Sequence, residues 1–228
     1  MKSYDVFLFD ADGTLFDFSK AEAFAFKSVF EKCGFVYSDK IMKRYSYINE
    51  QLWKSFERRE ITIDNIKTER FAQLFSELGI SYDTSAFNDL FVIELGKGAF
   101  LIDGAEEICK ELVLRNKKIY IITNGIAKVQ KARLNYSTIK EYISDCFISE
   151  LIGFQKPDVR YFDYVFSNIP QVGKDRILLI GDSLTADIAG GINAGIDTCW
   201  FNEFNIENRT GQKPVYEISR LSELHQFI

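Results

Sequence analysis

Short apolar segments alternate with amphipathic segments along most of the chain. Val6 to Phe9 (V-F-L-F) is too short for a helix and has no polar alternation, which is typical of a strand buried on both faces of a parallel sheet. Further strands are expected at 118–123, 146–149, 176–181 and 197–201. The helices expected after residue 104 are 106–116, 127–136, 158–167, 184–193 and 221–228. This alternation predicts parallel strands joined by right-handed crossovers.

One region interrupts the alternation. Four helical patterns follow one another with no strand pattern among them, at about 19–34, 39–59, 64–78 and 85–95. The first is expected to start with a capping box, Ser19-Lys20-Ala21-Glu22. We interpret 17–96 as an inserted helical domain, and 1–16 with 97–228 as the core. The predicted fold class is α/β, a Rossmann-like parallel-sheet core with an inserted α-helical domain.

The composition favours a folded protein that binds a small ligand. The chain has 228 residues with 46% hydrophobic content, which is enough for a large core, and its net charge of -5 argues against a nucleic-acid partner. No apolar run approaches 18 residues and no signal-type segment precedes the first strand, so we expect no membrane contact and a cytoplasmic location. The four cysteines are scattered and His225 stands alone, so any metal is expected to have oxygen ligands.

Polar residues follow three of the predicted strands where each strand ends. They are Asp10 and Asp12, then Thr123-Asn124-Gly125, then Gly181-Asp182-Ser183. The carboxyl edge of an open α/β sheet is where ligands bind, so these residues are expected to converge, and Lys156 on a later loop adds a cation. Two adjacent acids require a metal cation, a lysine or a shared proton. Each residue taken singly also has a structural explanation, such as a helix cap or a surface lysine.

Together these segments resemble the four motifs of the haloacid dehalogenase (HAD) superfamily of phosphotransferases. The four segments are F-D-A-D-G-T at 9–14, I-T-N-G at 122–125, the Lys156-Pro157 loop and G-D-S-L-T-A-D at 181–187. The resemblance implies that Asp10 is the nucleophile and Asp12 the general acid and base. It also implies that Thr123 binds phosphate and that Lys156 is its cationic partner. The expected substrate-binding residues are Thr123, Asn124, Gly125 and Lys156.

The same resemblance implies a magnesium site. Its ligands would be the Asp10 carboxylate, the backbone carbonyl of Asp12 and the Asp182 carboxylate, while Asp187 would support them from a second layer. Mg²⁺ prefers oxygen ligands of this kind together with phosphate oxygens and water. The expected reaction is hydrolysis of a phosphate monoester through an aspartyl-phosphate, which splits a very slow reaction into two steps.

In this superfamily, a helical insertion after the first motif resembles a mobile cap that carries the specificity residues. The glycines flanking it, Gly13, Gly96 and Gly98, are candidate hinges. The runs I-T-N-G-x-x-x-x-Q-x-x-R-L and G-G-I-N-A-G-x-x-T-C-W-x-N resemble those of bacterial pyrimidine 5'-nucleotidases. We therefore expect a small phosphorylated metabolite as substrate, a pyrimidine nucleoside monophosphate, with cap aromatics as a surface for its base. Those aromatics are Phe24, Trp53 and Phe56.

Other functions compatible with the fold remain as alternatives. A sugar phosphomutase or another small-metabolite phosphatase would share the cap and the acids. A haloacid dehalogenase attacks carbon without Mg²⁺ and lacks an acid at the position of Asp12, and a non-enzymatic binding module would be expected to have lost one acid. The intact set of acids therefore favours a phosphatase.

Overall fold

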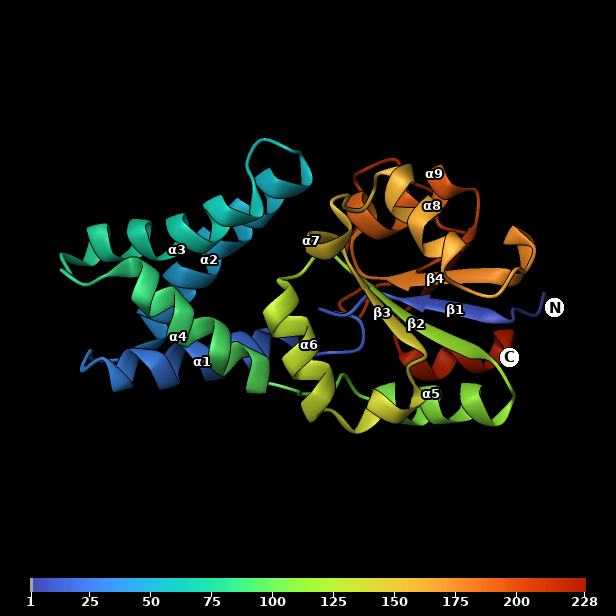
Figure 1. Ribbon diagram of the computed structural model, residues 1–228, viewed down its shortest axis with the longest axis horizontal. Coiled ribbons are helices and arrows are strands. Elements are labelled where there is room, and N and C mark those ends of the chain that lie inside the picture. The colour runs from blue at the N-terminus through green and yellow to red at the C-terminus, as the bar shows by residue number, and fades with distance from the viewer. Residues whose placement is uncertain (1) are drawn as a thin grey trace.

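A parallel β-sheet forms the centre of one half of the protein, shown on the right in Figure 1. The structure is a computed structural model that describes residues 2–228, and within these residues six parallel strands lie in the order β3-β2-β1-β4-β5-β6. The strands are β1 (Val6–Phe9), β2 (Lys118–Thr123), β3 (Asp145–Ile148), β4 (Ile177–Gly181), β5 (Asp197–Phe201) and β6 (Tyr216–Ile218). The predicted α/β fold is confirmed, and β2, β1 and β4 are neighbours.

Helices cover both faces of this sheet. The α-helices are α5 (Ala105–Leu114), α6 (Ala127–Tyr136), α7 (Ser149–Ile152), α8 (Val159–Ser167) and α9 (Ala189–Ala194). The shorter helical segments are η1 (Thr138–Tyr142), η2 (Lys174–Arg176), η3 (Leu184–Ile188) and η4 (Leu221–Phe227). Within residues 2–228, every helix is too short or too polar to cross a bilayer.

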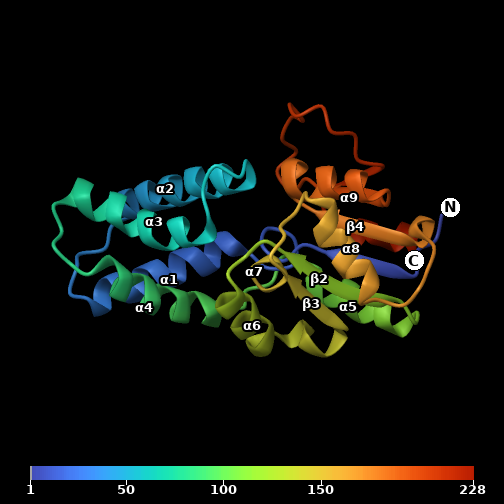
Figure 2. The same cartoon turned by 45° about the horizontal axis from the view of Figure 1, so that its top comes forward.

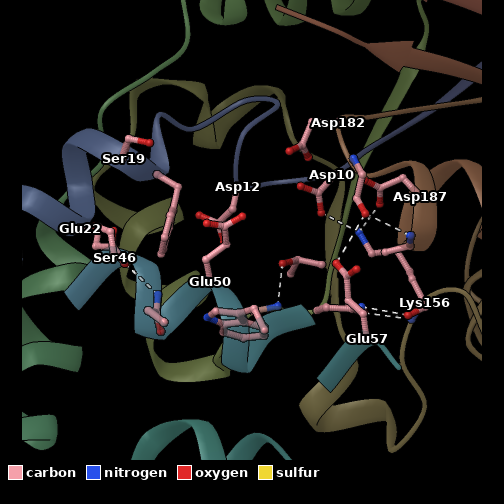
Figure 3. Close-up of a pocket in the computed structure, with 18 residues that line it drawn as sticks. Asp10, Asp12, Ser19, Glu22, Ser46, Glu50, Glu57, Lys156, Asp182 and Asp187 are labelled. Carbon is pink, nitrogen blue, oxygen red and sulfur yellow. Dashed lines mark hydrogen bonds and ion pairs between the residues drawn. The ribbon is translucent and has the colours of Figure 1, made fainter. Parts of the chain in front are cut away.

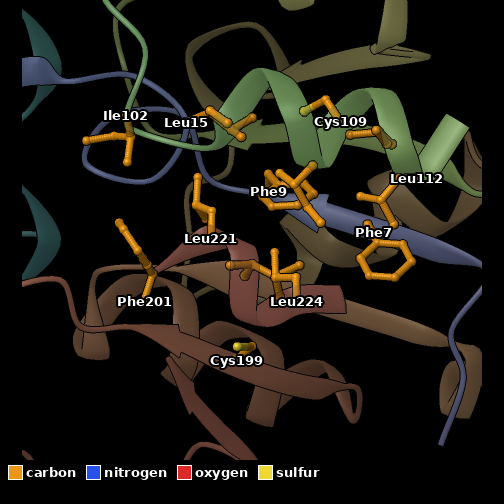
Figure 4. Packing of buried hydrophobic residues seen from close by; sticks show 14 of the residues in the cluster. Phe7, Phe9, Leu15, Ile102, Cys109, Leu112, Cys199, Phe201, Leu221 and Leu224 are labelled. Carbon is orange, nitrogen blue, oxygen red and sulfur yellow. The ribbon is translucent and has the colours of Figure 1, made fainter. Parts of the chain in front are cut away.

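Successive side chains of β1 enter two different hydrophobic layers. Phe7 and Phe9 pack in a cluster with α5 and η4 on one face of the sheet (Figure 4). Val6 and Leu8 pack against α8 on the other face. Because side chains alternate along a strand, burial of both faces requires an unbroken apolar run, which is the pattern that predicted this strand.

Four consecutive helices form a second hydrophobic core beside the sheet (Figures 1 and 2). They are α1 (Phe18–Lys32), α2 (Asp39–Glu57), α3 (Ile63–Leu78) and α4 (Thr84–Lys97). The rings of Phe26, Tyr45 and Phe71 stack in sequence, with centroids 4.7 and 5.1 Å apart. Val129 of α6 belongs to the same cluster, so this core continues onto the sheet-bearing part of the chain. The division into 1–16 with 97–228 and an inserted 17–96 stays a prediction.

The expected capping box at Ser19 is wrong. Helix α1 begins at Phe18, and Asp17 is its N-cap, because Asp17 Oδ1 accepts a hydrogen bond from the Lys20 backbone N–H at 2.9 Å. Asp caps a helix as well as Ser does, and it stands two positions earlier in the chain. Ser19 therefore lies in the first turn of α1, and the Glu22 side chain takes no part in capping this helix.

Two further differences from the sequence prediction concern the end of α4 and the edge of the sheet. The four helices α1 to α4 are called the helical group below. Gly96 lies inside α4, where a Cβ would come within 2.8 Å of the Ala132 Cβ, so this glycine permits close packing of α4 on α6. Its expected role as a hinge stays a prediction. Strand β6 was not predicted because its three residues, Tyr216 to Ile218, are too few and too polar to show a strand pattern.

Candidate active site

The loops that follow β1, β2 and β4 meet at one edge of the sheet. Phe9 is aligned with Ile121 of β2 and Ile180 of β4, and the Asp10 backbone N–H donates to the Ile180 carbonyl at 2.9 Å. Neighbouring parallel strands that end at the same level place their following residues together. The predicted residues that line one shared cavity are Asp10, Asp12, Thr123, Asn124, Gly125, Lys156, Asp182 and Asp187.

Lys156 is the central cation of this edge (Figure 3). Its Nζ donates to Asp10 Oδ1 at 2.6 Å, to Asp187 Oδ1 at 2.7 Å and to the Ile122 carbonyl at 2.8 Å. The side chain is buried, and burial alone would lower the pKa of Lys156. The two carboxylates outweigh this effect and raise its pKa above the usual value. Lys156 is therefore positively charged while it binds the carboxylates of Asp10 and Asp187.

Three carboxylates gather around this lysine. One oxygen from each of Asp10, Asp182 and Asp187 lies within 4.8 Å of the other two. Burial raises the pKa of Asp10 to about 7, although Lys156 opposes the shift. Desolvation by nearby protein, together with repulsion from Asp10 and Asp187, also raises the pKa of Asp182, whose side chain still has an exposed edge. Hard oxygen donors and an excess of negative charge fit a divalent cation such as Mg²⁺.

Both oxygens of Asp187 are engaged by protein donors. Oδ1 accepts from Lys156, and Oδ2 accepts from the Ser183 backbone N–H at 3.1 Å. Gly181 makes room for this carboxylate, because a Cβ at that position would lie 2.3 Å from Asp187 Cγ. The arrangement suits a residue that fixes Lys156 and the loop after β4, in agreement with the supporting role expected for Asp187, which stays a prediction.

A side chain at position 181 would occupy the space that the Asp187 carboxylate needs. Gly181→Ala is expected to force Asp187 away from Lys156, costing about 1 to 3 kcal/mol of stability and lowering kcat about tenfold or more. The measurements are urea unfolding and turnover of p-nitrophenyl phosphate. Gly34→Ala is the control, since the left-handed backbone of Gly34 (φ 80°) disfavours Ala but nothing lies within 4 Å of the added Cβ. It should lose stability and keep its kcat. A wild-type kcat in Gly181→Ala would show that Asp187 does not support the site.

Thr123 at the end of β2 and the two residues that follow it make different contacts. The Thr123 hydroxyl accepts a hydrogen bond from the Gly125 backbone N–H at 3.0 Å, which leaves its own proton for another acceptor. The Asn124 side chain instead binds the backbone of Lys156, donating to its carbonyl at 3.0 Å and accepting from its N–H at 2.9 Å. Asn124 thus holds the lysine loop in place, and the substrate contacts expected for it and for Gly125 stay predictions.

Asp12 stands apart from the other acids (Figure 3). Its Oδ1 pairs with Nη1 of Arg133, and its Oδ2 accepts from Nε2 of Gln130 at 2.5 Å. Neither Gln130 nor Arg133 was assigned a role from the sequence, although both belong to the Q-x-x-R run that was noticed. Their spacing was the available signal, because residues three apart share a helix face and α6 begins at the carboxyl edge of the sheet.

The helical group supplies the opposite wall of the cavity, which has a volume of about 430 Å³. The residues of α1 and α2 on this wall include Phe18, Ser19, Glu22, Ser46, Asn49, Glu50, Trp53 and Glu57. The Glu22 carboxylate accepts from Asn49 Nδ2 at 2.7 Å and from Ser46 Oγ at 2.8 Å, and burial raises the pKa of Glu22. The sequence reading missed this polar group, because a helix period alone does not show which polar residues face a neighbouring domain.

The expected aromatic residues have different positions. Trp53 lines the cavity, and its ring meets Phe56 edge to face at 5.6 Å. Phe56 itself lies outside the lining. Phe24 also lies outside the lining, and its ring packs against Phe100 at 5.8 Å, so the base contact expected of these two side chains has no support in the structure.

The end of α2 contacts the sheet-bearing part of the chain across the cavity. Glu57 Oε2 accepts from the Thr185 hydroxyl at 2.7 Å, and the Phe56 carbonyl accepts from the Gln155 side chain at 2.8 Å. These hydrogen bonds connect α2 to the part of the chain that carries the carboxylates, and residues of both parts line the cavity.

Known proteins are similar to this chain over most or all of its length. The profile of the haloacid dehalogenase-like hydrolases matches residues 4–195. The crystal structure of the HAD-hydrolase YfnB from Bacillus subtilis, bound to magnesium and described as revealing interdomain movement, superposes with a TM-score of 0.93 at 40% identity. It covers 99% of this chain and 98% of YfnB.

Two curated relatives are named for a nucleotide substrate. The pyrimidine 5'-nucleotidase PynA of Streptococcus pneumoniae is 36% identical over 97% of this chain and 93% of its own. The pyrimidine 5'-nucleotidase YjjG of Escherichia coli is 30% identical over 99% of this chain and 98% of its own. The resemblance inferred from the motifs is confirmed.

Proposed function

Because the chain belongs to the haloacid dehalogenase-like hydrolase family and is a phosphatase, we propose that it is a Mg²⁺-dependent 5'-nucleotidase. Its substrates are pyrimidine nucleoside monophosphates. The carrying observation is the buried contact between Asp10 and Lys156 in the lining of a cavity whose other wall is polar and aromatic. The expected cytoplasmic location stays a prediction.

Asp10 is the nucleophile of the proposed reaction. Lys156 holds Oδ1, and Oδ2 attacks the phosphorus while the bond from phosphorus to the 5'-oxygen of the nucleoside breaks. Asp12 in its protonated form gives a proton to that departing oxygen and is left as the carboxylate that pairs with Arg133. Asp12 then takes a proton from water, which attacks the phosphorus of the aspartyl-phosphate and releases inorganic phosphate and free Asp10. Lys156 and the Thr123 hydroxyl offset the charge of the phosphoryl oxygens.

The acid cluster is the proposed metal site. Asp10 and Asp182 would hold Mg²⁺ together with the backbone carbonyl of Asp12, and Asp187 would orient Lys156 beside it. Bound Mg²⁺ supplies charge neutralisation at the phosphate. The magnesium-bound relative YfnB supports this choice of ion.

The helical wall is the proposed site for the base. Trp53 offers a flat ring for stacking, which contributes about 1 to 3 kcal/mol per base. Glu22, Ser46 and Asn49 add polar atoms that suit the edge of a pyrimidine ring. Binding that is remote from the phosphate raises kcat/KM for substrates that carry a base. The names of PynA and YjjG support the same substrate class.

A substrate comparison tests this proposal. We expect kcat/KM to be higher for dUMP, dTMP and UMP than for AMP, glucose 6-phosphate or phosphoglycolate at one Mg²⁺ concentration. Trp53→Leu should lower kcat/KM for UMP about tenfold and leave p-nitrophenyl phosphate nearly unchanged. Tyr47→Leu is the control, since Tyr47 is an exposed aromatic residue on the same helix. A sugar phosphate or phosphoglycolate that exceeds every pyrimidine nucleotide tenfold would refute the nucleotidase assignment.

A further inference from the structure

The Asp12 carboxylate is held from one side by helix α6. Gln130 and Arg133, three residues apart on that helix, each bind one of its two oxygens. A carboxylate with both oxygens engaged by different donors has a defined orientation, whereas a single contact would leave it free to rotate. Its orientation here is away from Asp10, Asp182 and Asp187 (Figure 3).

Arg133 is an unusual residue in this position. Its side chain is fully buried, and two of its donors, Nε and Nη2, have no hydrogen-bond partner among the described residues. Its guanidinium carbon lies 5.5 Å from the ring of Phe16 and 5.9 Å from that of Phe18. A buried cation with unsatisfied donors costs stability, so packing alone does not account for an arginine here.

The surroundings of Arg133 join the site to the helical group. Phe16 forms β-bridges with Asp12 and with Leu101, so the two connections between the sheet and the helical group pair with each other at this residue. Phe18 is the first residue of α1. Arg133 therefore lies between the acid Asp12 and the start of the inserted helices.

We propose that Arg133, assisted by Gln130, is the positioning residue for Asp12. The two side chains hold the Asp12 carboxylate off the metal-binding acids, on the cavity side where it can exchange a proton with the departing oxygen and with water. Without them, the Asp12 side chain rotates, and proton transfer loses its geometry. This inference rests on the proton-transfer role proposed above for Asp12.

A double-mutant cycle tests the inference. Arg133→Met should lower kcat for UMP about 10²-fold with KM changed less than about threefold, because misplacing a catalytic group by about 1 Å costs that much. In an Asp12→Asn background, the same change should lower the residual rate less than about threefold. All four rates are measured with UMP, because a double-mutant cycle compares the same reaction in both backgrounds. Lys131→Met, an exposed cation on the same helix, is the matched control.

The outcomes separate this inference from the proposed function. If Arg133→Met lowers the rate about equally in both backgrounds, Arg133 does not act through Asp12 and the inference fails alone. If Asp12→Asn keeps wild-type kcat for UMP, both the proton-transfer role and the inference fail. Circular dichroism and thermal melting check the fold of each variant. Should Arg133→Met not fold, Gln130→Met provides the same cycle, with a smaller loss of kcat that should also disappear in the Asp12→Asn background.

Discussion

Asp10→Asn is expected to abolish phosphatase turnover while leaving the fold intact. The amide has the shape of the carboxylate and can still accept the hydrogen bond from Lys156, but it is not an anionic nucleophile. The measurements are kcat for UMP and p-nitrophenyl phosphate, with the melting temperature as the test of folding. We expect kcat to fall by at least about 10³-fold, since the covalent route is lost altogether.

The matched control is Asp89→Asn, an exposed acid on α4 that should keep its full activity. Asn at position 10 can revert to Asp by deamidation, so the preparation is checked by mass spectrometry. More than a small fraction of wild-type kcat in protein free of deamidation would exclude Asp10 as the nucleophile.

Removal of divalent metal is expected to abolish activity reversibly. Asp10, Asp182 and Asp187 bring three negative charges together against the single ammonium of Lys156, so two negative charges are left unbalanced when all of them are ionised. A phosphate dianion is repelled by such a site unless a divalent cation is bound. Turnover should disappear in excess chelator and return on addition of Mg²⁺.

Two variants separate metal binding from general charge effects. Asp182→Ala removes a proposed oxygen ligand and should weaken Mg²⁺ binding strongly, whereas Lys156→Ala removes only the contact that orients Asp10 and should weaken it less. Titration calorimetry with Mg²⁺ alone measures this without turnover. Equal Mg²⁺ affinities in the two variants would remove Asp182 from the set of direct ligands.

The strands of the sheet were readable from the chain. Both Val6–Phe9 and Lys118–Thr123 have the same bounds in the structure as in the sequence prediction. These strands are covered on both sides, so Val6–Phe9 and residues 119–122 of β2 are buried without polar alternation, and the end of each run is marked by the first polar residue, Asp10 or Thr123. Strand β6 is short and lies at the edge of the sheet, so it has no such pattern.

The residues of the candidate site could also be found from the ends of the apolar strands. Asp10, Thr123 and Asp182 lie at or directly after the ends of apolar strands, and the order β2-β1-β4 brings these ends together. The chemistry of each residue and its position at a strand end are properties of the sequence. The roles that the motif resemblance implies for these residues stay predictions.

Contacts between elements were decided only by the tertiary structure. Arg133 and Gln130 face Asp12 because α6 follows β2, which is paired with β1, and Asn124 binds the backbone of Lys156 because their two loops meet at the sheet edge. The sequence by itself determined most of the strands and helices, though not β6, and which acids follow the strands. The periodicity of one segment records which side of it is buried, but the partner of a polar group on that side depends on how two segments pack, and this is established only when the chain is folded.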